Sequence, residues 1–70
     1  MEYIVLAHSP SLGHSLRELQ LEGPAITRRD LAQMFAESFA TRLNQRQHMG
    51  AQDWQPKLDT IDPAFHARTL

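Results

Sequence analysis

The pattern of apolar and polar positions predicts two strands at the start of the chain. Residues Tyr3–His8 are rich in β-branched and aromatic side chains and end before a Ser-Pro pair, which is typical of a strand. In Leu16–Glu22, leucines alternate with polar residues, which indicates a half-buried strand that a Gly-Pro pair ends. Since a short loop rich in serine joins them, we expect the two strands to form an antiparallel hairpin.

A helix is predicted to follow the hairpin. Thr27 and Asp30 have the spacing of a capping box, with Asp in place of the usual Glu or Gln. Ile26 and Leu31 have the spacing of a hydrophobic staple, which fixes the direction in which the chain enters a helix. The helix is therefore expected to begin at Arg28.

The predicted helix is long and amphipathic. No glycine or proline interrupts the sequence before Gly50, which indicates a helix of roughly 21 residues. Asn44 is expected to face away from the sheet, while the stem of Arg42 covers apolar surface. The apolar side chains fall on one stripe, formed by Leu31, Ala32, Phe35, Ala36, Phe39 and Leu43.

A weaker pattern in Lys57–Ile61 predicts a third strand. Pro56 favours an edge position for this strand, or a later start, because proline cannot donate a hydrogen bond to a neighbour. Trp54 is expected to pack over Leu43, since strands of this length are too short to cover the whole helix. The position of the third strand in the sheet stays open.

These elements predict one small α+β domain over residues 1–62, followed by a flexible tail at 63–70. The order is β-β-α-β, an antiparallel hairpin and a weak third strand packed on one long amphipathic helix. Only one face of such a sheet is covered by the helix.

The composition narrows the classes of function. The 70 residues contain no cysteine, which excludes disulfides and thiolate metal sites, and the net charge of -1 is too small for bulk attraction to nucleic acid or anionic lipid. The apolar run near the N-terminus is too short for a membrane span or a signal peptide, so a cytoplasmic protein without membrane association is expected. A domain this small is expected to gain stability from a partner or from self-association.

The segment 8–15, His-Ser-Pro-Ser-Leu-Gly-His-Ser, is the first candidate for chemistry. A serine nucleophile needs a base and a group that orients the base, and the segment contains no acidic residue. His8 and His14 alone are too few ligands for zinc. Serine, proline and glycine are common in turns, so a hairpin loop is predicted, with contact to a partner as its alternative role. We predict no catalytic residue, no metal and no cofactor, and hence no enzyme.

Arg28 and Arg29 form a candidate anion-binding site at the start of the helix. Cations there oppose the helix dipole, but beside free backbone N–H groups they would bind a phosphate or a carboxylate. The structural alternative is a pair of solvated arginines near an acidic neighbour such as Glu22. Together with the 8–15 loop, the arginines define the alternative function of a nucleic-acid-binding accessory protein. The outward helix face lacks the basic residues of a groove reader, which disfavours nucleic-acid binding.

The uncovered sheet face is the main functional candidate. Ile4 and Leu6 are assigned to one face of the first strand, and Tyr3, Val5 and Ala7 to the other, which is taken as the free face. A partly apolar free face predicts a non-enzymatic interaction module that binds a protein partner or forms a homodimer. Apolar residues scattered on a surface without any function are the alternative. The candidate partner-binding residues are Tyr3, Val5, Ala7, Glu18, Gln20, Glu22 and Met34.

The segment 39–58, Phe-Ala-Thr-Arg-Leu-Asn-Gln-Arg-Gln-His-Met-Gly-Ala-Gln-Asp-Trp-Gln-Pro-Lys-Leu, resembles small uncharacterised proteins of bacterial prophages and integrative mobile elements. The resemblance covers about a third of the chain and implies no activity. It does imply a bacterial mobile-element protein that binds a host complex, with an inhibitor similar to anti-CRISPR proteins as a further alternative. The residues that carry it are Leu43, Asn44, Gly50, Asp53 and Trp54.

Overall fold

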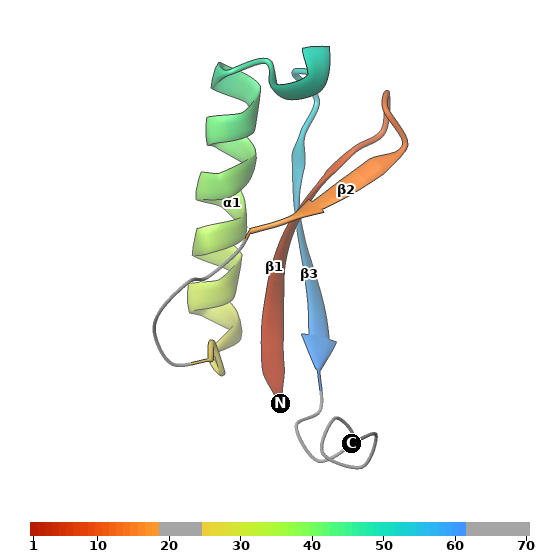
Figure 1. Ribbon diagram of the computed structural model, residues 1–70. Coiled ribbons are helices and arrows are strands. Elements are labelled where there is room, and N and C mark those ends of the chain that lie inside the picture. The colour runs from red at the N-terminus through yellow and green to blue at the C-terminus, as the bar shows by residue number, and fades with distance from the viewer. Residues whose placement is uncertain (19–24, 62–70) are drawn as a thin grey trace.

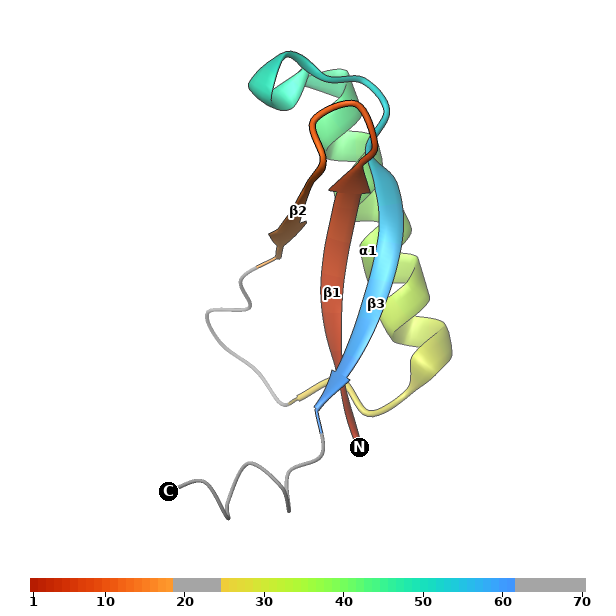
Figure 2. The same cartoon turned by 90° about the vertical axis from the view of Figure 1, so that its right-hand side faces the viewer.

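The computed structural model describes residues 1–18 and 25–61. Its elements in chain order are β1 (Glu2–Ser9), β2 (His14–Arg17), α1 (Arg29–Gln45), the short 3-10 helix η1 (His48–Gly50) and β3 (Gln55–Ile61). The strands form one antiparallel sheet in the order β2-β1-β3, and α1 lies against one face of it (Figure 1). Figure 2 shows β1 and β3 side by side with α1 behind them. The predicted α+β class and β-β-α-β order are confirmed.

The sheet gives the third strand its place beside β1. β1 pairs along almost its whole length with β3, from Glu2 opposite Ile61 to His8 opposite Gln55. β1 is therefore the central strand, and Pro56 lies on an edge strand, as the sequence predicts.

The hairpin is tighter than predicted. β2 begins at His14 rather than at Leu16, and the backbone N–H of Gly13 donates to the carbonyl of Ser9 at 2.8 Å. Gly13 has a φ of 68°, a conformation that glycine adopts at little cost. The later part of the predicted second strand, residues 19–22, lies outside the described residues.

The two faces of β1 have the opposite roles to those predicted. Val5 packs with Ala32 and Ala36 of α1, and Ala7 packs with the next part of the helix. Tyr3 is partly buried against the Val5 cluster. Placing Tyr3, Val5 and Ala7 on the free face is therefore wrong. The alternation of side chains along a strand assigns them to two faces. Which of the two faces the helix covers depends on how closely that face fits the helix.

Most of the predicted stripe of α1 is confirmed, since Ala32, Ala36 and Leu43 are buried and Phe39 is partly buried, but its centre lies on the alanines. Ala32, Ala36 and Ala40 recur every four residues and are almost fully buried, at 0%, 0% and 3% exposure. Leu31 and Phe35, which the pattern places in the stripe, remain 38% and 46% exposed. The small alanine side chains let α1 lie close to the sheet, and this close fit leaves the larger side chains at its flank.

Both predicted ends of the helix are wrong. The capping residue is Arg28, which makes no side-chain cap hydrogen bond, while Thr27 lies exposed before it. Ile26 packs against the Val5 cluster. At the other end α1 stops at Gln45, and Gln47 adopts a left-handed conformation with φ 48°. The hydrogen bonds between Asn44 and the backbone of Trp54 favour an early turn there over continued helical hydrogen bonding.

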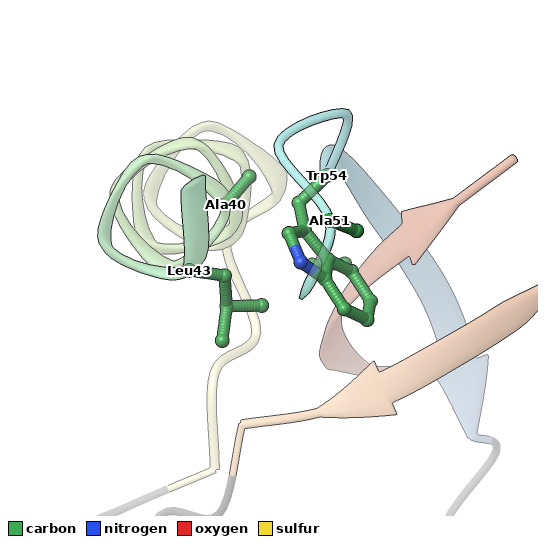
Figure 3. Packing of buried hydrophobic residues seen from close by; sticks show 5 residues of the cluster. Ala40, Leu43, Ala51 and Trp54 are labelled. Carbon is green, nitrogen blue, oxygen red and sulfur yellow. The ribbon is translucent and has the colours of Figure 1, made fainter. Parts of the chain in front are cut away.

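The larger of the two core clusters lies where α1 ends. Trp54 is 3% exposed and packs with Ala7, Ala40, Leu43 and Ala51. Figure 3 shows Ala40 and Leu43 of α1 beside the indole ring of Trp54. The prediction that Trp54 packs over Leu43 is confirmed.

Candidate functional site

The hairpin loop is tied to a distant acidic residue, Asp53. The Ser9 hydroxyl donates to Asp53 Oδ1 at 2.5 Å, the Ser11 hydroxyl donates to the same oxygen at 2.9 Å, and the Ser11 backbone N–H donates to Asp53 Oδ2 at 2.7 Å. Ser9 is fully buried, and its hydroxyl also accepts from the Leu12 backbone N–H at 3.3 Å. The serines therefore fasten the loop to the segment before β3.

This cluster is organised as a structural tie rather than as a nucleophile and base. The hydrogen bond from Ser9, followed by those from Ser11, lowers the pKa of Asp53, because these donors stabilise the charged carboxylate. A carboxylate with a lowered pKa is a poor general base. His8 instead hydrogen-bonds the Ser15 hydroxyl at 2.8 Å through Nδ1. Both residues lie on the face of the sheet that carries Ile4 and Leu6. In residues 1–18 and 25–61, no group of three or more His, Cys, Asp or Glu side chains is placed to hold a metal ion.

Asn44 joins the end of α1 to the start of β3. Its side-chain amide donates to the Trp54 carbonyl at 3.0 Å, and its Oδ1 accepts from the Trp54 backbone N–H at 2.8 Å. The indole Nε1 of Trp54 donates to the His48 carbonyl at 3.2 Å. The prediction that Asn44 faces away from the sheet is wrong, because its amide pairs both backbone groups of a buried residue.

The two arginines of the candidate anion site are not equivalent. Arg28 makes two contacts to Asp30, from Nε to Oδ1 at 3.2 Å and from Nη2 to Oδ2 at 2.6 Å. This pairing lowers the pKa of Asp30 and occupies the guanidinium. Arg29 is exposed in the first turn of α1. The hairpin loop lies at the opposite end of α1, so the structure does not bring the 8–15 loop and the arginines together (Figure 1).

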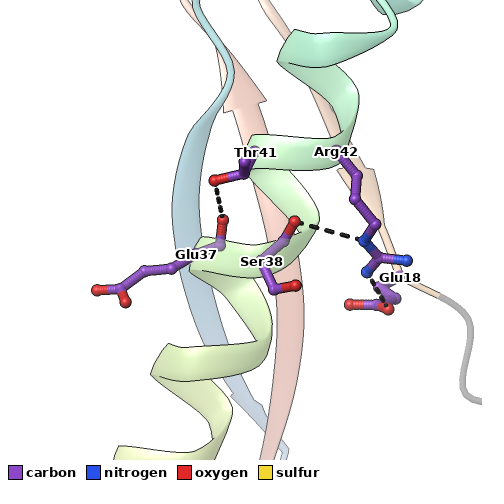
Figure 4. A network of polar contacts seen from close by, with 5 residues as sticks. All are labelled: Glu18, Glu37, Ser38, Thr41 and Arg42. Carbon is purple, nitrogen blue, oxygen red and sulfur yellow. Dashed lines mark hydrogen bonds and ion pairs between the residues drawn. The ribbon is translucent and has the colours of Figure 1, made fainter.

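Glu18 belongs to the helix side of the sheet. Its Oε1 accepts from Arg42 Nη2 at 2.7 Å, and Arg42 Nε donates to the Ser38 carbonyl at 3.4 Å (Figure 4). The Arg42 guanidinium also lies 5.8 Å from the ring centroid of Phe39, which confirms that the arginine covers apolar surface. The placement of Glu18 on the free face is therefore wrong, and Gln20 and Glu22 lie outside the described residues.

The face of the sheet away from α1 carries a different set of residues. Ile4 and Leu6 lie at its centre and pack against neither core cluster. The register sets Arg17 and Lys57 on either side of Leu6, while Asp59 lies beside Ile4. We call this surface the outer sheet face, and it comprises Ile4, Leu6, Arg17, Lys57, Asp59 and Ile61.

A second apolar surface lies on α1. Leu31, Met34 and Phe35 are 38%, 64% and 46% exposed, and their spacing places them on one side of the helix. We call these three residues the helix patch. Met34 is exposed as predicted, but it belongs to α1, which covers the opposite face of the sheet from the outer sheet face.

Comparisons with protein-family models, with curated proteins and with solved structures give no significant match to this chain. Over the described part of the chain, no helix has the length and apolar character needed to cross a lipid bilayer.

Proposed function

We propose that this chain is a non-enzymatic protein-interaction module that binds through its outer sheet face. The observation that carries the proposal is the position of Ile4 and Leu6, two branched apolar side chains at the centre of a sheet face that α1 leaves uncovered. Both are only half-buried in the single chain. Covering them with a partner would remove further apolar surface from water, which is the main driving force of protein association.

The edge of β3 is protected, which favours the face over the edge for binding. The N–H of Tyr3 donates to the carbonyl of Ile26, and the carbonyl of Val5 accepts from the N–H of Glu18. The backbone groups of these two β1 residues therefore point away from β3. By the antiparallel pattern, Pro56, Leu58 and Thr60 turn theirs toward the free edge of β3.

Two of those three edge positions offer no free donor. Pro56 has no N–H, and the N–H of Thr60 donates to Asp59 Oδ1 at 2.8 Å. Among these three positions an added strand would find one backbone donor, the N–H of Leu58, beside the carbonyls. Removing donors from an edge is a common way for proteins to hinder edge-to-edge pairing.

The charge of the outer sheet face fits a protein surface better than a nucleic acid. Arg17 and Lys57 share the face with Asp59, and Glu2 lies at its end. The carboxylates on the same face as these cations would repel a phosphate backbone. The setting that the resemblance implies, a bacterial mobile-element protein acting in the cytoplasm on a host complex, belongs to this proposal, with inhibition of a defence complex as its narrower form.

Site-specific photo-crosslinking tests the proposal. A photoreactive amino acid replaces Leu6 on the outer sheet face or, as the control, Gln33 on the exposed side of α1. The full chain is produced at its native level in its source cell and irradiated. We expect a discrete protein adduct from position 6 and none of comparable yield from position 33, with the partner identified by mass spectrometry. No adduct from position 6, or equal adducts from both positions, contradicts the proposal.

A further inference from the structure

Residues that lie directly opposite one another on neighbouring strands form a level, and the charges of the outer sheet face differ from one level to the next. At the level of Leu6 the flanking side chains are both cationic, Arg17 on β2 and Lys57 on β3. At the level of Ile4 the flanking side chain on β3 is anionic, Asp59. One end of the face is thus positive and the other negative, with an apolar residue at the centre of each level.

We infer that the partner of the outer sheet face is a second copy of this chain, packed face to face with its strands antiparallel. The inference rests on the proposed function, since it names the occupant of the same surface. The two copies are related by a two-fold axis that lies between the sheets and perpendicular to the strands, at the level of Val5 and Leu58. This axis brings the Leu6 level of one copy over the Ile4 level of the other.

This symmetry places the Leu6 level of each copy over the Ile4 level of the other. Leu6 packs on Ile4 of the partner subunit, and Lys57 lies near Asp59 of the partner subunit. The two-fold axis repeats both contacts, so that two apolar pairs are flanked by two ion pairs. Contacts that are complementary in both directions are what an isologous dimer requires.

The other simple face-to-face arrangement is disfavoured by the same charges. A two-fold axis parallel to the strands would exchange the β2 and β3 sides of the sheet. Lys57 would then lie over Arg17 of the partner subunit, and the two like charges would repel each other. The charge pattern therefore selects the antiparallel arrangement.

The size of the face predicts a weak dimer. The strands β1, β2 and β3 have eight, four and seven residues, so at about 3.4 Å per residue and about 4.8 Å per strand they cover about 310 Å² of sheet. Two copies would bury about 600 Å², well below the roughly 1,200 Å² of stable interfaces. A dissociation constant on the order of 100 μM is expected, so that the dimer forms at high local concentration.

Sedimentation equilibrium of the full chain between about 10 μM and about 1 mM tests this inference. The natural chain should self-associate reversibly over that range. Leu6→Lys should raise the dissociation constant more than about tenfold, because it places a charge in the apolar centre. Met34→Lys, the matched change on the helix patch, should leave it unchanged. Circular dichroism and thermal melting confirm that each variant is folded.

Two charge variants test the antiparallel arrangement. Lys57→Asp makes β3 acidic at both levels and Asp59→Lys makes it basic at both, so each variant should dimerise about tenfold more weakly than the natural chain. An equimolar mixture of the two should form heterodimers at least as tight as the natural dimer, because the levels are again complementary. A structural role of either residue would not produce this recovery.

The outcomes separate this inference from the proposed function. A chain that is monomeric at about 1 mM overturns the inference, while a crosslink from position 6 to another protein still supports the interaction module. A dimer that Met34→Lys disrupts and Leu6→Lys does not disrupt overturns the inference by placing the interface on the helix patch. Tighter dimers of Lys57→Asp overturn the antiparallel arrangement. No crosslink from position 6 to any protein, together with a chain that stays monomeric at about 1 mM, overturns both the inference and the proposed function.

Discussion

The two ends of α1 are held to the sheet in different ways. At the C-terminal end, which we call the Trp54 end, polar side chains connect segments that are distant in sequence: Asp53 holds the hairpin loop, and Asn44 holds both backbone groups of Trp54. At the N-terminal end, which we call the Val5 end, Ala32 and Ala36 pack on Val5. Four larger, partly buried residues surround them: Tyr3, Ile26, Phe39 and Leu58. The ion pair there, Arg28 with Asp30, joins residues only two positions apart.

This contrast indicates where the fold derives its specificity. Hydrogen bonds between distant segments at the Trp54 end fix the relative positions of the hairpin, the helix and β3, and they shield one another from water. The Val5 end has a backbone bond from Tyr3 to Ile26 and otherwise relies on packing around the alanines of α1. It leaves Met34 and Phe35 exposed. We therefore expect substitutions at the Trp54 end to cost much more stability than substitutions at the Val5 end.

Trp54→Ala should have the largest effect. It removes the largest side chain of the core cluster, and the free energy of unfolding should fall by about 3–5 kcal/mol, most of the stability of a domain this small. Urea denaturation followed by circular dichroism measures the loss. Trp54→Phe keeps the ring but removes the hydrogen bond to the His48 carbonyl, so its loss should be smaller. Equal losses for the two variants would contradict a packing role.

Asn44→Ala should have the next largest effect. The N–H and the carbonyl of the buried Trp54 would both lose their partner, which should lower the free energy of unfolding by about 1–3 kcal/mol. Gln45→Ala, on the next and exposed residue of α1, should change it by less than about 0.5 kcal/mol. The same urea experiment compares them, and similar values for the two variants would show that the Asn44 bonds contribute little.

The Asp53 tie should make stability depend on pH. The folded-state pKa of Asp53 is lowered, so its contribution is present above the unfolded value of about 4 and is lost as the pH falls through the lowered pKa. Asp53→Asn should therefore have a lower urea midpoint than the natural chain at pH 7, and the difference should shrink toward pH 2.

Asp30→Asn provides the control for the pH experiment. The pKa of Asp30 is also lowered, chiefly by its hydrogen bond with Arg28, but the two side chains are 64% and 68% exposed. Solvent screens such a pair, so the change should be the smaller of the two. A larger pH-dependent loss for Asp30→Asn than for Asp53→Asn would reverse the proposed ranking of the two ends.

Thr27→Ala should have the smallest effect, at the Val5 end. A capping threonine would contribute about 0.5–2 kcal/mol, but the capping position of α1 is taken by Arg28, so we expect a change within about 0.5 kcal/mol. Thermal melting of the two chains side by side is sufficient. A clear loss would show that Thr27 does cap the helix, as its spacing from Asp30 suggests.

The sequence predicted the elements better than their contacts. The strands and the helix follow from local patterns, which a few neighbouring residues determine. The contact between Trp54 and Leu43 followed from the length of the helix relative to the strands. The tie between Asp53 and Ser9 spans 44 positions, and no local pattern indicates it. The only signal was indirect, an acidic residue directly before a tryptophan expected in the core.

The candidate site shows the same division. The sequence indicated that one sheet face stays uncovered and that Met34 is exposed, but it assigned Val5 to the wrong face. The predicted stripe of α1 included Ala32 and Ala36, which are buried, but it also included Leu31 and Phe35, which remain exposed.

The sequence by itself therefore determined that this chain forms an α+β fold with one covered sheet face. Periodicity and turn residues act over a few positions, so they act before any tertiary contact forms. Only the tertiary structure decided the strand order, the buried side of α1 and the residues of the outer sheet face. Each of these depends on how closely surfaces from distant parts of the chain fit, and that fit is a property of the packed layers.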